Sequence, residues 1–329
     1  MRRLRCYFVT ICKRLRSPDA TEKPSNTECS PHPTNRDSFH LPRLPDSRST
    51  VDCPEHKLRR GAYLLQDMWY IYRNYTFMLD VRDVQWIDAK TMSFHAQCLE
   101  PVVSWRPLLT DPGQLDRRDP IRKSLLSFLT CKTVIAHLHA VAVWMLEDIA
   151  ILQEASAGLQ CPPLSVERTN AEGQPKCNAM FEHCLWRVTL KDKQHLSYAL
   201  DLSGAQYGWY DPLISWEELL RDRCDTSHLV LNASGLENYE MHIDWARTRR
   251  RADYTWTYDI ANGFEALMTT QFRVWDSGAT EMLELPEMEF QQKRRAFLDM
   301  VRQFIEAAVM SANTMYVREQ GLEVPQAGG

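Results

Sequence analysis

Alternating apolar and polar residues indicate a β-hairpin in the middle of the chain. From Cys184 to Leu190 the side chains alternate with a period of two, which is typical of a half-buried strand. Lys191 to Lys193 supplies a polar turn, and Tyr198 to Leu202 is the expected return strand. Ser203-Gly204 would end that strand, because glycine permits unusual backbone angles. A shorter pattern predicts a second hairpin, with strands at 84–87 and 92–96 around a turn at 88–91.

Other segments repeat their apolar residues every three or four positions, which indicates amphipathic helices. We expect one helix from near Leu58, a central one from about Ser124 to Gln153, and a long one from Pro286 to about Tyr316. A short helix should begin at Trp216, with Ser215 as its N-cap. The expected fold class is therefore α+β, with a small antiparallel sheet packed on a central helix and a long C-terminal helix.

Composition suggests how the chain is divided. With 329 residues, 44% of them hydrophobic, it can bury a sizeable core, and we expect a single α+β domain at 58–320. Residues 1–57 are basic and rich in Pro and Ser, and we expect a disordered tail there and another at 321–329. The first 18 residues also have the composition of a mitochondrial presequence, although a solvated basic tail is the commoner outcome. We expect a cytoplasmic or nuclear location.

Charge and cysteine usage narrow the possible partners. A net charge of -4 and a pI near 6.2 give no reason to expect nucleic acid or an anionic membrane as partner. The basic cluster around Arg249 to Arg251 is expected to be a solvated face, and no apolar run reaches the roughly 20 residues of a membrane span. The scattered cysteines indicate reduced thiols in an intracellular protein, and because none are spaced as C-x2-C we expect no metal and no cofactor.

Cysteine, histidine and aspartate occur in an order that suits nucleophilic catalysis. Cys131 is expected near the start of the central helix, His183 opens the first hairpin strand, and Asp201 lies near the end of the second. A thiolate at a helix N-terminus can attack a carbonyl, an imidazole can move the proton, and a carboxylate can orient the ring. Gln206 could donate a hydrogen bond to an oxyanion.

The block DLSGAQYG, from Asp201 to Gly208, resembles the transglutaminase-like branch of the papain-like fold. In that branch a histidine followed by a tryptophan begins one strand, and an aspartate in a D-x-[ST] context ends the next. There the histidine and tryptophan stand two residues apart, whereas His183 and Trp186 are three apart. Strand alternation therefore puts Cys184 in the histidine position and predicts that the His183 ring points away from the thiol.

A further resemblance is to uncharacterised fungal proteins, some of them beside MYND-type zinc fingers, that share three short motifs. The motifs here are Trp186-Arg187-Val188, Tyr198 to Gly208, and Pro212 with Trp216-Glu217-Glu218; no such finger is present. This resemblance implies an accessory or interaction protein with a protein partner, possible ties to a secondary-metabolite pathway, and an open oligomeric state.

Two hypotheses follow from these residues. We favour a non-catalytic papain-like scaffold in which Asp201 and Gln206, with Gly204, Tyr207 and Gly208, shape a structural turn. The alternative is a cysteine hydrolase or acyltransferase that uses Cys131, His183 and Asp201.

Overall fold

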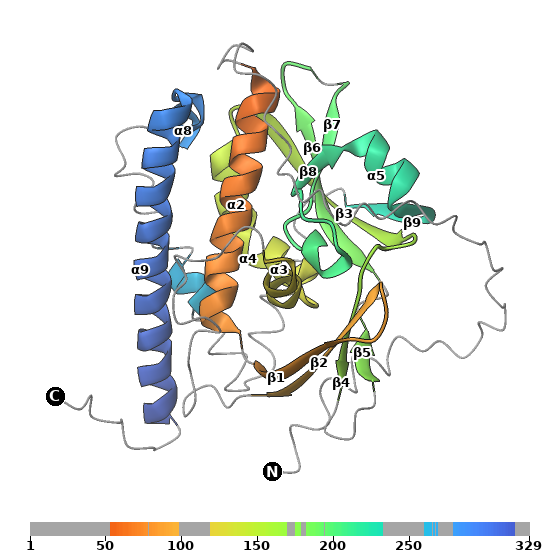
Figure 1. Cartoon of the computed structure of the whole chain (residues 1–329). Helices are drawn as coiled ribbons and strands as arrows, with labels where there is room; N and C mark the ends of the chain where they lie inside the picture. Colours follow the sequence, from red (N-terminus) through yellow and green to blue (C-terminus); the bar gives the residue numbers. More distant parts are fainter. Residues whose placement is uncertain are drawn as a thin grey trace. The chain divides into compact units, whose positions relative to one another are not determined.

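The computed structural model describes residues 53–77, 79–98, 119–169, 175–178, 182–193, 195–232, 260–264, 266, 268 and 279–319. All of them belong to the second of two compact units, Leu41–Gly329. Residues 1–52 of the tail expected at 1–57, the tail expected at 321–329, and the cluster Arg249 to Arg251 lie outside the described residues. The expected boundary at residue 57 is wrong, because residues 54–57 form the first turn of a helix. Helices and strands are mixed, and the predicted α+β class is confirmed (Figure 1).

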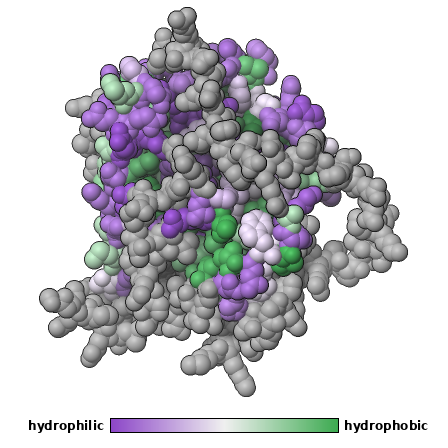
Figure 2. All heavy atoms as spheres, viewed as in Figure 1, coloured by the Kyte–Doolittle hydropathy of each residue, from purple (hydrophilic) through white to green (hydrophobic). Residues whose placement is uncertain are grey.

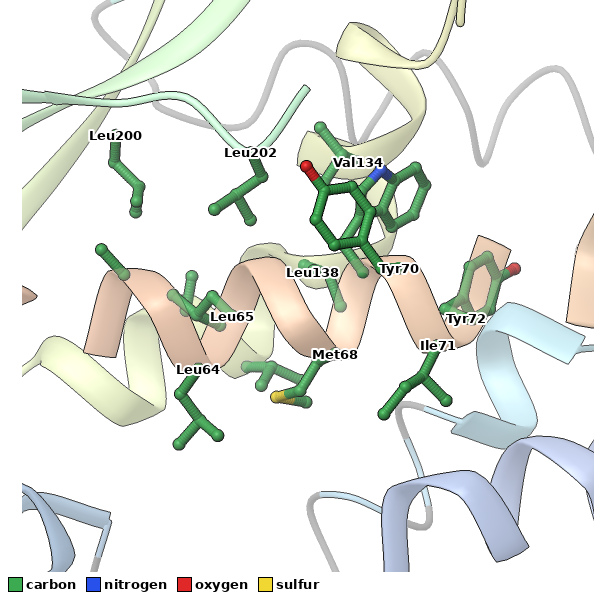
Figure 3. Packing of buried hydrophobic residues seen from close by; sticks show 14 of the residues in the cluster. Leu64, Leu65, Met68, Tyr70, Ile71, Tyr72, Val134, Leu138, Leu200 and Leu202 are labelled. Atoms are coloured by element: carbon green, nitrogen blue, oxygen red, sulfur yellow. The ribbon is translucent and has the colours of Figure 1, made fainter. Parts of the chain in front are cut away.

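Helix α2, Pro54–Thr76, is the most deeply buried helix described. Proline suits its first turn, where no intrahelical donor is needed. Figure 3 shows the side chains of Leu65, Met68 and Tyr72, which project from this helix into the hydrophobic core. The sequence placed this helix correctly, although it begins at Pro54 rather than Leu58.

The long C-terminal helix α9, Glu287–Glu319, lies beside α2, and the short helix α8, Ala279–Glu284, precedes it (Figure 1). Its predicted apolar face is confirmed, because Phe297, Val301 and Ile305 are buried. Arg60 connects α2 to α8 and α9. Its guanidinium donates to the carbonyl oxygens of Leu283 and Leu285 and forms an ion pair with Glu287.

The expected central helix at 124–153 is wrong in its extent. It divides into α3, Pro120–Ser127, and α4, Cys131–Leu146, and the chain then enters strand β3 at Ala150. The break falls at Leu129, whose φ of 55° lies in the left-handed region. A left-handed residue cannot continue a right-handed helix. As a result Cys131 becomes the first residue of a new helix.

A five-stranded antiparallel sheet supports the site, in the order β8-β7-β6-β3-β9. Its strands are β3 (Ala150–Leu159), β6 (His183–Leu190), β7 (Ser197–Leu200), β8 (Leu213–Ser215) and β9 (Cys224–Leu231). The hairpin predicted around Lys191 to Lys193 is confirmed as β6 and β7. Helix α4 packs on β6, against the face that carries Trp186 and Val188. Helix α5, Trp216–Asp222, has the predicted N-cap, since Ser215 Oγ accepts from Glu218 N–H.

A second sheet has four strands in the order β1-β2-β4-β5. These are β1 (Leu79–Trp86), β2 (Thr91–Cys98), β4 (Ser165–Thr169) and β5 (Pro175–Asn178). The predicted β1–β2 hairpin is confirmed, and Asp88 closes its turn by accepting from the N–H groups of Lys90 and Thr91. Strand β4 pairs in parallel with β2. Leu164, the residue before β4, donates its N–H to the carbonyl oxygen of Tyr207, and this hydrogen bond connects the second sheet to the turn after β7.

Hydrophilic residues predominate among the described residues on the face shown in Figure 2, and hydrophobic ones form small groups. Within the described part of the chain, no single helix combines the length and apolarity needed to cross a membrane. The bent pair of α3 and α4 meets those two criteria together, with an angle of 86° between its halves.

Candidate functional site

Cys131 occupies the first position of α4, where unpaired backbone N–H groups favour a negative charge. Its side chain is half-buried, and the sulfur lies 3.6 Å from the carbonyl oxygen of Glu182. The turn before it depends on Gln206, whose Oε1 accepts a 2.8 Å hydrogen bond from Leu129 N–H. A side chain 75 residues further along the chain than Cys131 thus fixes where α4 begins.

His183 and Asp201 form a buried pair on adjacent strands. His183 opens β6, Asp201 follows β7, and Nε2 of the ring lies 2.8 Å from Oδ2 of the carboxylate. The two residues are only 1% and 4% exposed, so water competes little for this contact. The structure therefore brings together the histidine and aspartate that the sequence singled out.

The strand faces are as expected, with Cys184 and Trp186 on one face and His183 on the other, yet His183 is not remote from the thiol. The pairing of β6 with β3 is regular from His183 to Leu190, and Cys184 shares the core cluster of Trp186. The Cys131 thiol nevertheless contributes to the raised pKa of His183, although Nδ1 of the ring has no hydrogen-bond partner among the described residues. His183 can lie near the thiol because it is the first residue of the strand, at the end of the sheet where α4 begins. Alternation predicts which face a side chain occupies within a strand, but it constrains the first residue of a strand less, because that side chain can also turn past the edge of the sheet.

Electrostatic interactions favour charge on all three groups. The hydrogen bond with Cys184 lowers the pKa of Cys131; burial opposes this, but contact with His183 adds to it, and the pKa falls well below its ordinary value. Burial lowers the pKa of His183, but the charge and hydrogen bond of Asp201 outweigh it and raise the pKa to about 10. Burial raises the pKa of Asp201, yet the charge of His183 holds it below its usual value. The arrangement favours a thiolate, an imidazolium and a carboxylate at neutral pH.

The turn after β7 holds Asp201 in place. Its Oδ1 accepts from the backbone N–H of Ser203, which leaves Oδ2 for the imidazole. A side chain at Gly204 would not fit, because a Cβ there would lie 2.5 Å from Asp201 Oδ2 and 3.0 Å from the carbonyl oxygen of Trp209. Glycine at this position therefore allows the close approach that the carboxylate needs.

The rest of the DLSGAQYG block forms a 3-10 helix, Gly204–Tyr207, capped by Gly208 with a φ of 84°. The Tyr207 ring meets the imidazole of His183 edge to face, with centroids 4.9 Å apart. The segment proposed from sequence as a structural turn thus supports both members of the His183 and Asp201 pair.

Gln206 is fully buried at the opposite side of this turn. Leu129 N–H fixes its amide oxygen, which leaves Nε2 as the donor end, and Nε2 has no acceptor among the described residues. A buried donor without a partner is costly in free energy, and its occurrence calls for an explanation. Gln206 lies next to the turn that carries Cys131, where a ligand oxygen could supply the missing acceptor.

Two features of the site were missed from the sequence. Cys184, interpreted only as a possible replacement for His183, lies against Cys131 instead. Lys132 and Glu182, which follow Cys131 and precede His183, form an ion pair of 2.7 Å at the rim. Their positions next to Cys131 and His183 were the only sign of this ion pair in the sequence. Lysine and glutamate are so common that two of them at distant positions do not predict a contact.

The cysteines differ in state. Cys53, Cys131, Cys184 and Cys224 are free thiols, whereas Cys161 is disulfide-bonded, so the expectation that all cysteines are reduced is wrong for Cys161. No group of three or more His, Cys, Asp or Glu side chains within the described residues is arranged to hold a metal ion.

Comparison with known proteins adds no identification: no family model, no curated protein and no solved structure matches this chain.

Proposed function

We propose that this protein is a thiol-dependent hydrolase or acyltransferase in which Cys131 is the nucleophile. The observation that carries the proposal is the 2.8 Å contact of His183 Nε2 with Asp201. It leaves the other ring nitrogen, Nδ1, without a hydrogen-bond partner among the described residues, and the Cys131 thiol at the start of α4 is near enough to influence the charge of the ring. Nucleophile, base and orienting carboxylate are the three parts that covalent acyl transfer requires. The papain-like ancestry is part of the proposal, supported by their order on one helix and two adjacent strands.

Each residue has a defined part in the reaction. The Cys131 thiolate attacks the carbonyl carbon of an acyl substrate, and His183 then gives its proton to the leaving group, which produces a thioester on the sulfur. In the second half His183 accepts a proton from water or from another acyl acceptor, which attacks the thioester and frees the thiol. Asp201 keeps the ring oriented and stabilises its charged form.

The negative oxygen that forms on the substrate needs donors. Helix α4 presents its first N–H groups beside the thiol, and the unpartnered Nε2 of Gln206 is a second candidate from the other side of the turn. Each such donor typically contributes about 3 kcal/mol to stabilisation of the transition state.

A second candidate function retains the interpretation favoured by the sequence, a non-catalytic scaffold that acts through a protein partner. It is favoured by the bond from Ser203 N–H to Asp201, since this carboxylate braces its own turn as well as the imidazole. In that case Cys131 would be an inert structural thiol, and the two candidates can be separated by measuring its reactivity.

The test is the rate of alkylation by iodoacetamide at pH 6, with the labelled cysteine located by peptide mass. We expect Cys131 to react at least tenfold faster than the other free thiols, because it is ionised where an ordinary thiol with a pKa of about 8.5 is not. His183→Ala should reduce this advantage, because contact with the imidazole is one of the interactions that lower the pKa of Cys131. His195→Ala is the matched control, since this histidine is exposed in the turn between β6 and β7 and should have no effect.

Turnover of a panel of thioesters, activated esters and glutamine-containing peptides would then identify the substrate class, with Cys131→Ser as the inactive reference. Equal labelling of Cys131 in the wild type and in His183→Ala would exclude the enzyme and leave the scaffold.

A further inference from the structure

Cys131 has a second sulfur beside it. Cys184 projects from β6 towards α4 and is only 1% exposed, within the same core cluster that Cys131 borders. The Cys131 sulfur lies 3.6 Å from the carbonyl oxygen of Glu182, two residues before Cys184 on the same segment, and each of the two thiols influences the charge of the other. The packing of α4 on β6 and the contact of Cys131 with the carbonyl of Glu182 keep the sulfurs together.

In the acyl-transfer chemistry Cys184 helps to lower the pKa of Cys131 but transfers no proton, because His183 supplies it. Its interaction with Cys131 and its burial both raise the pKa of the Cys184 thiol, so it stays protonated beside an ionised neighbour. A nucleophilic, half-exposed thiolate beside a protected second thiol is the arrangement of a sulfur that oxidises first and a sulfur that resolves it.

We propose that Cys131 and Cys184 form a reversible disulfide that switches the site off under oxidising conditions. As a regulatory switch, this disulfide rests on the proposed function, since it would inactivate the nucleophile of that reaction. The bond itself can form whether or not the protein turns over a substrate. Closing the disulfide would also protect Cys131 from irreversible oxidation.

The reaction requires a two-electron oxidant, for which hydrogen peroxide suffices. The Cys131 thiolate attacks one peroxide oxygen, the O–O bond breaks, and the products are a sulfenic acid on Cys131 and, after protonation, water. The Cys184 sulfur then attacks the Cys131 sulfur, the S–O bond breaks, and the hydroxyl group leaves with the Cys184 proton as a second water. Both sulfurs are oxidised by one electron each, and peroxide is reduced.

Only local movement is needed to close the bond. A disulfide requires the sulfurs at about 2.05 Å, with the two Cα atoms within about 7 Å. The packing of α4 on β6 and the contact of Cys131 with Glu182 bring the start of the helix to the segment that carries Cys184. Cys131 is the first residue of its helix and directly follows the irregular turn at Leu129, so its backbone is less constrained than one within a helix.

The test uses the full chain, exposed to a small molar excess of hydrogen peroxide and then alkylated with N-ethylmaleimide before proteolysis. We expect a peptide pair linked through Cys131 and Cys184 that dithiothreitol separates, with iodoacetamide reactivity of Cys131 lost on oxidation and recovered on reduction. The disulfide already present at Cys161 is mapped in the untreated protein and serves as the baseline.

Two variants examine the resolving thiol. Cys184→Ser and Cys184→Ala should give no linked pair, and Cys131 should advance to the sulfinic acid, which dithiothreitol does not reverse. Cys224→Ser is the matched control, because Cys224 is also a buried free thiol but lies on β9 in the smaller core cluster; it should keep the linked pair. Using two replacements at position 184 guards against a variant that fails to fold.

The proposal is overturned if the wild type yields the sulfinic acid at Cys131 as fast as the Cys184 variants do, or if Cys131 links to another cysteine. Such a result leaves the proposed function intact when Cys131 still alkylates rapidly at pH 6. Conversely, a linked pair in a protein that turns over none of the acyl substrates would uphold the disulfide and count against the enzyme.

Discussion

The charge state of His183 and Asp201 makes a contribution to stability that changes with pH in a definite direction. His183 has its pKa raised from about 6.5 in the unfolded chain to about 10, so its contribution is complete below the first value and is lost as the pH rises towards the second. Asp201 has its pKa lowered, so its contribution is present above about 3.9 and is lost on acidification below that. The pair therefore stabilises the fold most between about pH 4 and 6.5.

Asp201→Asn should expose this dependence. Asparagine can still accept a hydrogen bond but carries no charge, and we expect the free energy of unfolding to fall by about 3 kcal/mol at pH 5 and by much less near pH 10. Urea unfolding at both pH values measures the difference. Alkylation of Cys131 at pH 6 should slow in parallel, because a neutral imidazole no longer stabilises the thiolate. Asp192→Asn, in the exposed turn of the hairpin, should leave both measurements unchanged.

At the scale of single elements, the start of α4 depends on one unfavourable backbone angle. Leu129 lies at a φ of 55°, a conformation that costs roughly 1–2 kcal/mol for a residue with a Cβ. The hydrogen bond from its N–H to Gln206 offsets part of that cost. The interruption separates α3 from α4 and puts Cys131 at a helix N-terminus.

We expect Leu129→Gly to be more stable than Leu129→Ala by about 1 kcal/mol, because only glycine adopts this φ without a steric penalty. Both variants remove the same partly exposed side chain, so the loss of packing cancels in the comparison. Thermal unfolding of the two proteins decides the matter. Equal stabilities, or a more stable alanine variant, would show that the angle at Leu129 is not strained.

Prediction of the elements succeeded where the hydrophobic period was strong. Helices α2, α5 and α9 and both hairpins follow directly from their patterns. It failed at 124–153 because apolar spacing carries no information about backbone handedness, and the apolar residues that lead into β3 continue the helical period by coincidence. Strands β3, β4, β5, β8 and β9 were missed. Strands β4, β5 and β8 are short, and apolar alternation is too weak to mark a strand of only a few residues.

The candidate site was predicted in its residues but not in its geometry. Cys131, His183, Asp201 and Gln206 were all singled out, because their residue types and order suggest acyl-transfer chemistry. Their contacts could not be derived, since they depend on where a strand starts relative to a helix end. That relation is set by long-range packing of α4 on β6.

Across the whole molecule, the first and last described helices are joined through Arg60. This side chain lies 5% exposed beneath the ring of Phe290 and binds two carbonyl oxygens at the end of α8 as well as Glu287. It thus combines a cation–π contact with caps for carbonyl groups that would otherwise lack a donor.

Arg60→Met should loosen the C-terminal helices more than the rest of the fold. We expect a loss of about 1–3 kcal/mol in the free energy of unfolding from the carbonyl groups left without donors, and faster amide hydrogen exchange in α8 and α9 than in β6 and β7. Arg221→Met, which removes an exposed ion pair with Asp222, is the control and should not change exchange in either region. Uniform acceleration over all elements would argue against a local role for Arg60.

The pairing of α2 with α9 also bears on how the chain is made. Arg60 and Glu287 are separated by 227 residues, so α2 leaves the ribosome long before the helix that covers it. At roughly 5–20 residues per second, the apolar side of α2 waits some tens of seconds for its partner. During that interval the nascent chain exposes apolar surface of the kind that makes incompletely folded chains prone to aggregation.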